Sequence, residues 1–161
     1  MQRNYRGGFT LLEIMIVVLI AVIVTVFSVP AYKKAQDKNR FMAASGVLID
    51  LGNAIRMFSA DYPDASAVAG DVTANATNSS ATAPANNTNN QFTGWLQSNN
   101  YLNQIPFTSG TYMGYSFKFS TSGTAKCGYC AAEGVACMSG ANLNSEYTCA
   151  FVTKQGQLKT L

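Results

Sequence analysis

Four cysteines in the last 35 residues are the densest group of reactive side chains in this 161-residue chain. They are Cys127, Cys130, Cys137 and Cys149, with the spacing Cys-x2-Cys-x6-Cys-x11-Cys. An even number of clustered cysteines predicts disulfides in an exported domain, with three possible connectivities. Cys-x2-Cys is also a common zinc half-site, although the second half has the wrong spacing. A redox centre is a third interpretation, but no thioredoxin-like βαβ pattern surrounds the pair.

A single carboxylate stands near the start of a long apolar run. Glu13 is the one charged residue between Phe9 and Val29, a stretch of 21 residues. A helix needs about 20 residues to cross the hydrocarbon core of a bilayer. Placing a carboxylate at the bilayer centre costs about 2.5–3.5 kcal/mol, and less near the interface. A carboxylate in such a segment therefore indicates a functional residue that pairs with an opposite charge. The alternative is that Glu13 lies at the headgroup level and is tolerated there.

The segment before this run is polar and basic, with Arg3 and Arg6. Basic residues on this side predict that the N-terminus stays cytoplasmic and that the rest is exported. A secretory signal peptide does not fit, because its apolar region is only 7–15 residues long and precedes the cleavage site. Here Gly7-Gly8 precedes the apolar run, so cleavage at that point would leave the hydrophobic helix on the mature protein.

The stretch from Gly8 to Val17, Gly-Phe-Thr-Leu-Leu-Glu-Ile-Met-Ile-Val, resembles the prepilin N-terminal motif of type IV pilins and type II secretion pseudopilins. The resemblance implies that a prepilin peptidase cuts between Gly8 and Phe9, and that the new amino group of Phe9 is N-methylated. It also implies that Glu13 pairs with the Phe9 amino group of a neighbouring subunit during assembly. A buried carboxylate is disfavoured until an opposite charge compensates it, so Glu13 would select one stagger between subunits.

The composition gives little support for an enzyme, a metal site or a nucleic-acid-binding protein. The chain has no histidine, which removes the commonest general base and metal ligand. We see no nucleophile–base constellation and no Gly-rich phosphate loop, and we expect no enzyme activity, cofactor or metal site. The net charge is +3, from 11 basic and 8 acidic residues, and falls to +1 without Arg3 and Arg6. This balance does not indicate a nucleic-acid-binding protein.

The elements that position these residues begin with one long helix. Pro30 either kinks this helix or ends it, and we favour a kink because helical patterning resumes directly afterwards. Pro63 predicts the helix end at residues 61–62. Gly46 and Gly52 weaken the helix, and close helix contacts in a filament are one reason to keep them. Apolar residues at spacings of three and four predict a face that packs on the protein's own globular part: Phe41, Ala44, Leu48, Leu51, Ile55 and Phe58.

We therefore divide the chain into a cleaved leader (1–8), a membrane and filament-core half-helix (9–30), an amphipathic half-helix (31–62) and a globular head (63–161). Residues 65–91 are rich in Ala, Asn, Thr and Ser and predict a long exposed loop. Alternation predicts strands over 112–119 and 147–153, with a turn at 155–157 and a short last segment. We expect residues 128–144 to form a loop that disulfides attach to the sheet. The predicted fold class is α+β, a long N-terminal helix on a small antiparallel sheet, and the resemblance to pilins implies the same.

Three functions remain open at this point. The first is a pilin, which polymerises through its N-terminal helix into a type IV pilus-like filament. The second is a type II secretion pseudopilin, and the third is a minor pilin that binds DNA or a host ligand at the filament tip. The resemblance implies copies of the chain, a prepilin peptidase, an inner-membrane assembly platform and the membrane itself as partners. The subunit would lie in the inner membrane with its head outside the cytoplasm, and then in a pilus or periplasmic filament. A single-pass membrane protein that never polymerises would leave Glu13 and the Gly8–Phe9 junction unexplained.

Overall fold

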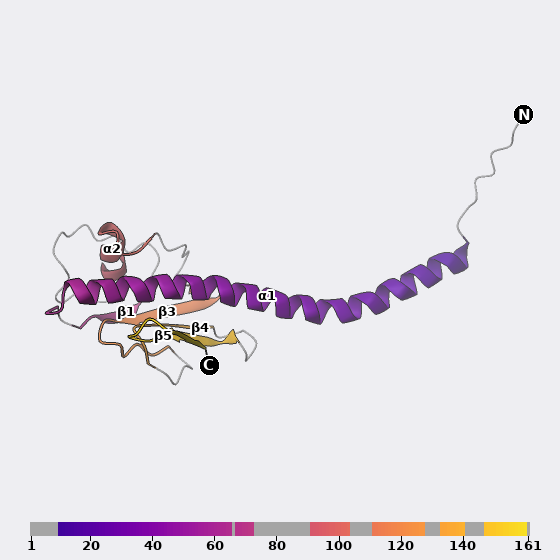
Figure 1. Cartoon of the computed structure of the whole chain (residues 1–161). Coiled ribbons are helices and arrows are strands. Elements are labelled where there is room, and N and C mark those ends of the chain that lie inside the picture. The colour runs from indigo at the N-terminus through magenta and orange to yellow at the C-terminus, as the bar shows by residue number, and fades with distance from the viewer. Residues whose placement is uncertain are drawn as a thin grey trace, which may run out of the picture. The chain divides into compact units, whose positions relative to one another are not determined.

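The computed structural model describes residues 10–65, 67–72, 91–103, 111–127, 133–140 and 147–160. Two compact units make it up, one ending at Gln36 and the other beginning at Asp37. Helix α1 (Leu11–Asp61) begins in the first unit and ends in the second. The second unit, which we call the head, also contains helix α2 (Gln91–Ser98) and the strands of a sheet (Figure 1).

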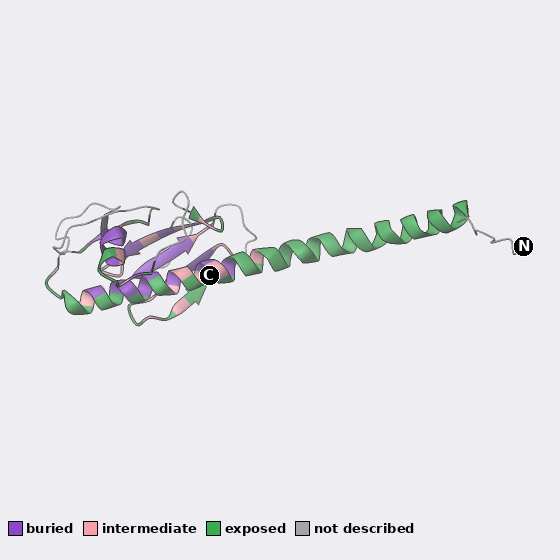
Figure 2. Cartoon of the chain, turned by 90° about the horizontal axis from the view of Figure 1, so that it is seen from above, coloured by how far each residue is buried: buried purple, intermediate pink, exposed green. Residues whose placement is uncertain are grey.

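The head is built on one face of α1. All six residues of the predicted apolar stripe are buried, whereas Met42, Asp50 and Arg56 on the other side of the helix are exposed (Figure 2). The helix ends at Asp61, two residues before Pro63, as the sequence predicts. The α+β fold class is also confirmed, because this face of α1 packs against a small antiparallel sheet. These residues belong to the stripe: Phe41, Ala44, Leu48, Leu51, Ile55 and Phe58.

Two glycines of α1 give a matched test of this packing. A Cβ built on Gly52 would lie 2.7 Å from Cγ1 of Val152 on the sheet, whereas one on Gly46 would meet nothing within 4 Å. We expect Gly46→Ala to raise the free energy of unfolding by about 1 kcal/mol, because alanine favours the helix. Gly52→Ala is expected to lower it by about 1–2 kcal/mol, because overpacking outweighs the same gain. Urea unfolding measures both, and a stabilised Gly52→Ala variant would contradict the close approach.

The sheet is antiparallel, with strand order β1-β3-β4-β5-β6. Strand β2 pairs with the first part of β3, on the same edge of β3 as β1, because β4 occupies the other edge. Strand β4 lies in the middle of the order, between β3 and β5 (Figure 1). The strand bounds are β1 (Ala69–Asp71), β2 (Thr111–Tyr112), β3 (Tyr115–Ser120), β4 (Ala136–Ser139), β5 (Cys149–Val152) and β6 (Leu158–Thr160).

Two sequence predictions about this sheet were wrong, and a third was right only in part. The expected loop over 128–144 contains the central strand β4, whose residues pair with both β3 and β5. The expected strand over 112–119 is confirmed from Tyr115 onward as β3, but Tyr112 belongs to β2 and pairs with Tyr115 across a turn with positive φ at Met113 and Gly114. The expected loop over 65–91 includes strand β1 at one edge of the sheet. The turn and the short last segment are confirmed by the hairpin from β5 to β6.

The two faces of the sheet bury different groups. Phe117, Met138 and Ala150 are cross-strand partners and belong to the core that includes α1. The next residues along these strands, Cys137 and Phe151, point to the opposite face because side chains alternate along a strand. They form a second apolar cluster there with Ala125, Cys127 and Cys149. Strand β4 is therefore buried on both sides.

Helix α2 closes the end of the core nearest the C-terminus of α1. Phe58 lies 4.9 Å from Phe92 and 5.5 Å from Trp95 between ring centroids, both edge to face. Phe92 also stacks on Phe119 of β3 at 5.0 Å. Such pairs add about 0.5–1.5 kcal/mol each to the burial of the rings. The aromatic side chains thus connect α1, α2 and the sheet in a single packed region.

The buried Tyr115 should make the protein less stable at alkaline pH. Its hydroxyl donates a hydrogen bond to the carbonyl oxygen of Tyr147 at 2.6 Å. Burial is the main cause that raises its pKa from 10.0 to about 12, and the Asp37 carboxylate adds to this. Because only the neutral phenol is favoured in the fold, its contribution is complete below pH 10 and is lost as pH rises from 10 through 12.

We therefore expect Tyr115→Phe to flatten the loss of unfolding free energy between pH 10 and 12, as measured by urea unfolding at each pH. At pH 7 the variant should be less stable by about 1 kcal/mol, because the hydrogen bond to Tyr147 is missing. Tyr101, whose pKa is also raised to about 12, chiefly by its hydrogen bond to Asp61, should still titrate late in the variant. If Tyr115→Phe lost as much unfolding free energy between pH 10 and 12 as the original protein, the loss could not be attributed to Tyr115.

Candidate functional site

The start of α1 is fixed by a capping interaction at Thr10. The Oγ1 atom of Thr10 accepts a hydrogen bond from the backbone N–H of Glu13 at 3.3 Å, and the Thr10 carbonyl accepts one from Ile14. A threonine followed three residues later by a glutamate is the capping-box pattern of a helix N-terminus. This role was missed from the sequence, although Thr10-Leu11-Leu12-Glu13 carries the pattern.

Glu13 therefore lies in the first turn of the helix. The partial positive charge of the helix N-terminus favours a carboxylate there, which lowers the cost of keeping one at the edge of an apolar segment. Gly8 and Phe9, the predicted cleavage and N-methylation residues, lie outside the described residues. The structure thus positions the carboxylate at the end of the helix that the predicted cleavage would expose.

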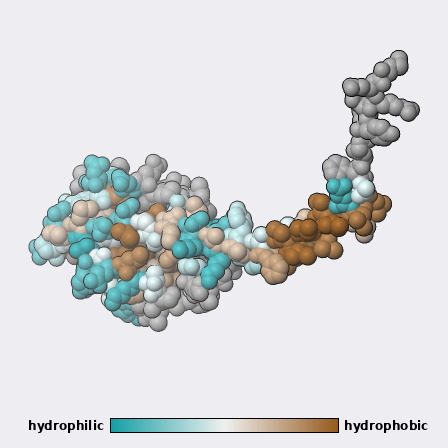
Figure 3. Space-filling view, turned by 45° about the vertical axis from the view of Figure 1, so that its right-hand side comes forward, coloured by the Kyte–Doolittle hydropathy of each residue, from teal (hydrophilic) through white to brown (hydrophobic). Residues whose placement is uncertain are grey.

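The described part of the apolar run, residues 10–29, is exposed within the single chain. Large hydrophobic residues from Leu11 to Val29 each keep half or more of their surface accessible. The run appears brown in Figure 3, and α1 is long and apolar enough there to cross a membrane. So large an exposed apolar surface marks a segment that contacts lipid or other protein chains.

The hydroxyl groups of Thr25 and Ser28 in this segment are hydrogen-bonded within the helix. The Thr25 hydroxyl donates to the carbonyl oxygens of Ala21 and Val22, at 3.0 and 2.8 Å, and the Ser28 hydroxyl donates to Val24 at 2.8 Å. This pairing suits an environment without water. The helix continues through Pro30, so the interpretation that Pro30 ends it is wrong. The predicted kink stays a prediction.

Cys127, Cys137 and Cys149 belong to the head and lie on the sheet face opposite α1. A disulfide joins Cys127 to Cys137 of β4, with Cα atoms 5.8 Å apart. Cys149 of β5 is also disulfide-bonded, and Cys130 lies outside the described residues. The predicted disulfide chemistry is therefore present at Cys127 and Cys137, and these two sulfurs are not zinc thiolates.

The hairpin that carries Cys127 is held by further contacts. The backbones of Ala125 and Gly134 form a two-way bridge, with N···O distances of 2.8 and 3.3 Å. The Lys126 ammonium pairs with Glu133 at 2.7 Å. A Cβ on Gly134 would overlap the carbonyl oxygen of Val152, which shows how closely this segment crosses β5. These contacts attach residues 125–127 and 133–134 to the sheet.

A comparison with known protein families adds one positive finding. The family model described as the prokaryotic N-terminal methylation motif matches residues 3–29. This is the part of the chain that contains Gly8, Phe9 and Glu13, and it ends at the last residue of the apolar run. No curated protein and no solved structure matches the chain.

Proposed function

We propose that this chain, which carries the prepilin-type motif of type IV pilins and pseudopilins over residues 3–29, is the structural subunit of a type IV pilus-like filament. In this proposal a prepilin peptidase removes residues 1–8, and Phe9 becomes the N-methylated first residue of the mature chain. Copies then assemble through the apolar half of α1, with the heads on the outside. The polypeptide acts by polymerising and not by catalysis.

The observation that carries the proposal is the apolar run under this motif. Its described residues, 10–29, are all exposed within the single chain, so the run needs a second environment to bury it. A bilayer provides one before assembly, and the same run on neighbouring copies provides another afterwards. Cleavage before Phe9 supports this exchange, because it would leave the complete run on the mature subunit.

Glu13 supports a defined stagger between subunits. When the subunit moves from the bilayer to the filament core, the Glu13 carboxylate stays in an apolar environment, where a positively charged partner stabilises it. Cleavage at Gly8–Phe9 would create a new amino group four residues before Glu13. We therefore place the Phe9 amino group of an adjacent subunit opposite Glu13, which rewards one register and penalises the others.

The partners follow from this route. The precursor lies in the inner membrane with Arg3 and Arg6 on the cytoplasmic side, where the peptidase and an assembly platform act on it. The head lies outside the cytoplasm, and a disulfide such as Cys127–Cys137 persists in that oxidising location. The finished filament extends from the cell surface or remains in the periplasm.

Intact-mass and N-terminal peptide analysis of protein from native membranes tests the processing step. We expect a chain that begins at Phe9 and carries one methyl group on its amino terminus. A mature protein that still begins at Met1 would overturn the proposal. This measurement does not depend on which filament the subunit builds.

Labelling of sheared filaments then identifies the filament. An antibody against the head is expected to label filaments from native cells along their whole length. Label confined to the tips would assign the chain to the minor pilins. Label that stays within the cell envelope would favour the pseudopilin alternative.

A further inference from the structure

A cavity on the head lies beside the C-terminal turns of α1, far along the chain from the apolar run. Its volume is about 330 Å³, at the lower end of the range for small-molecule sites. Arg56, Ser59 and Ala60 of α1 line one part of it, and Thr121, Val135 and Lys154 line the rest. The cavity therefore brings together two cations that are 98 positions apart in the sequence.

Neither cation has an ion-pair or hydrogen-bond partner among the described residues, and no carboxylate lines the cavity. Other lysines of the head differ in this respect. Lys118 pairs with Asp71 at 3.3 Å, and Lys126 pairs with Glu133 at 2.7 Å. Arg56 and Lys154 thus place two positive charges at one cavity, and no carboxylate among the described residues neutralises them.

Two glycines leave the space that these side chains occupy. Gly156, in the turn before β6, has φ +83°, and a Cβ there would overlap the Arg56 guanidinium. Gly123, in the turn after β3, has φ +79°, and a Cβ there would overlap the side chain of Lys154. Both turns need glycine for their backbone conformation, and each also lets a cationic side chain lie across it.

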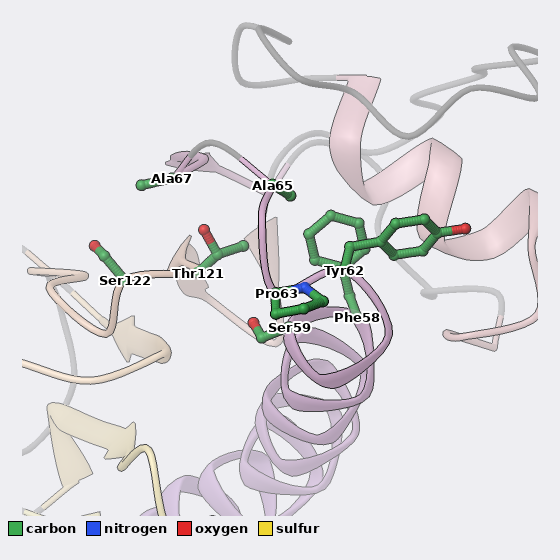
Figure 4. Close-up of a pocket in the computed structure, with 8 residues that line it drawn as sticks. All are labelled: Phe58, Ser59, Tyr62, Pro63, Ala65, Ala67, Thr121 and Ser122. Carbon is green, nitrogen blue, oxygen red and sulfur yellow. The ribbon is translucent and has the colours of Figure 1, made fainter.

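A second, smaller cavity adjoins the first. It has a volume of about 150 Å³ and shares Ser59 and Thr121 with the first cavity. Figure 4 shows it between the end of α1 and the segment after β3, with Phe58, Tyr62 and Pro63 forming its apolar wall. The cationic cavity therefore lies next to a second cavity with an apolar wall, where an uncharged organic group could lie.

We propose that the cavity between Arg56 and Lys154 binds a phosphate monoester, with the organic part of the ligand in the adjoining cavity. A phosphate monoester carries a charge of about −1.5 to −2 at pH 7, which matches two cations better than a single carboxylate does. The planar guanidinium of Arg56 provides two parallel donors for phosphate oxygens, and the Lys154 ammonium provides a point charge.

This site goes beyond the filament role and does not rest on it, because every residue that lines it belongs to the head. A subunit that never assembles would still bind the ligand, and a filament subunit without this site would still polymerise. The test therefore uses the full chain as single subunits in a non-ionic detergent.

Isothermal titration with inorganic phosphate as the probe is the first measurement. At pH 7.5 we expect saturable binding at one site per chain. Binding should weaken at pH 5.5, because inorganic phosphate takes up a proton between these two pH values and then carries a single negative charge. Acetate at the same ionic strength should bind at least about tenfold more weakly, because it has one charge. Equal binding of acetate, or no saturation by phosphate, would overturn the proposal.

Charge-removing variants locate the site. Arg56→Gln and Lys154→Gln should each weaken phosphate binding by about tenfold or more, the effect expected from losing a charge-assisted hydrogen bond. Lys159→Gln removes the same charge from exposed strand β6 and should change the affinity less than twofold. Similar weakening by all three variants would mean attraction to the surface in general, and would sink the site. Thermal unfolding shows whether each variant remains folded. If Arg56→Gln does not fold, Lys154→Gln still tests the site.

Discussion

Replacement of Glu13 by glutamine should abolish filament assembly while the subunit still accumulates in the membrane. The two side chains have nearly the same size, so the variant removes the charge and little else. A buried ion pair that loses one partner costs about 3–5 kcal/mol, because the other charge stays uncompensated. Repeated at every subunit contact, this cost should reduce the yield of sheared filaments by at least about a hundredfold. Immunoblots of the sheared and membrane fractions measure both quantities.

Two further variants distinguish this role from the simpler ones. Thr10→Ala removes the hydroxyl that accepts the hydrogen bond from the Glu13 N–H, which costs about 1 kcal/mol of helix stability. If Glu13 served only the helix terminus, Thr10→Ala would impair assembly as strongly as Glu13→Gln. Thr25→Val removes a polar group from the same run without touching a charge, and should leave assembly intact. Normal filaments from Glu13→Gln would refute the proposed ion pair.

The parts of this molecule that the sequence predicts well depend on residues close together in the chain. The stripe from Phe41 to Phe58 repeats at helical spacing over several turns, and all of it is buried as predicted. The N-terminal motif was also recognised from a local pattern, in which Gly8, Phe9 and Glu13 lie within six positions, and the family model matches this part of the chain. Local patterns of this kind need no knowledge of the rest of the fold.

Strand β4 shows why the sheet was predicted less well. Its residues Ala136-Cys137-Met138-Ser139 lie in a Gly- and Ala-rich stretch, and the first three are buried, Ala136 and Met138 in the core with α1 and Cys137 in the disulfide cluster on the other face. A strand buried on both faces has no alternation of polar and apolar residues to reveal it. The turn at Met113-Gly114 was missed for a related reason, since methionine rarely adopts positive φ and does not signal a hairpin.

The cationic cavity was out of reach for another physical reason. Lys118, Lys126, Lys154 and Lys159 are scattered in the sequence, and the fold pairs two of them with carboxylates. It places a third, Lys154, next to Arg56 from a different element. Only the packing of the β5–β6 hairpin against α1 decides which charges meet and which are neutralised. Sequence spacing carries no information about that choice.

Removal of the Cys127–Cys137 disulfide should cause a large loss of stability in the head. The bond closes a ring between residues ten positions apart, which is worth about 3 kcal/mol in the chain-entropy model. Both half-cystines are fully buried, so the double variant Cys127→Ala/Cys137→Ala replaces them with small apolar side chains and leaves no buried hydroxyl. We expect the free energy of unfolding to fall by about this amount under non-reducing conditions. Urea unfolding of the full chain in detergent, followed by tryptophan fluorescence from Trp95, measures it.

The ion pair beside this disulfide provides the matched control. Lys126→Gln removes the contact with Glu133 in the same region, but both side chains are exposed, so the loss of stability should be small compared with that of the double alanine variant. Because β4 lies between β3 and β5, a hairpin released from Cys137 would also loosen the middle of the sheet. The double alanine variant should therefore lose protection from amide hydrogen exchange across β4, which Lys126→Gln should keep. Equal stability of the two variants would mean that strand pairing alone, without the disulfide, holds this loop on the head.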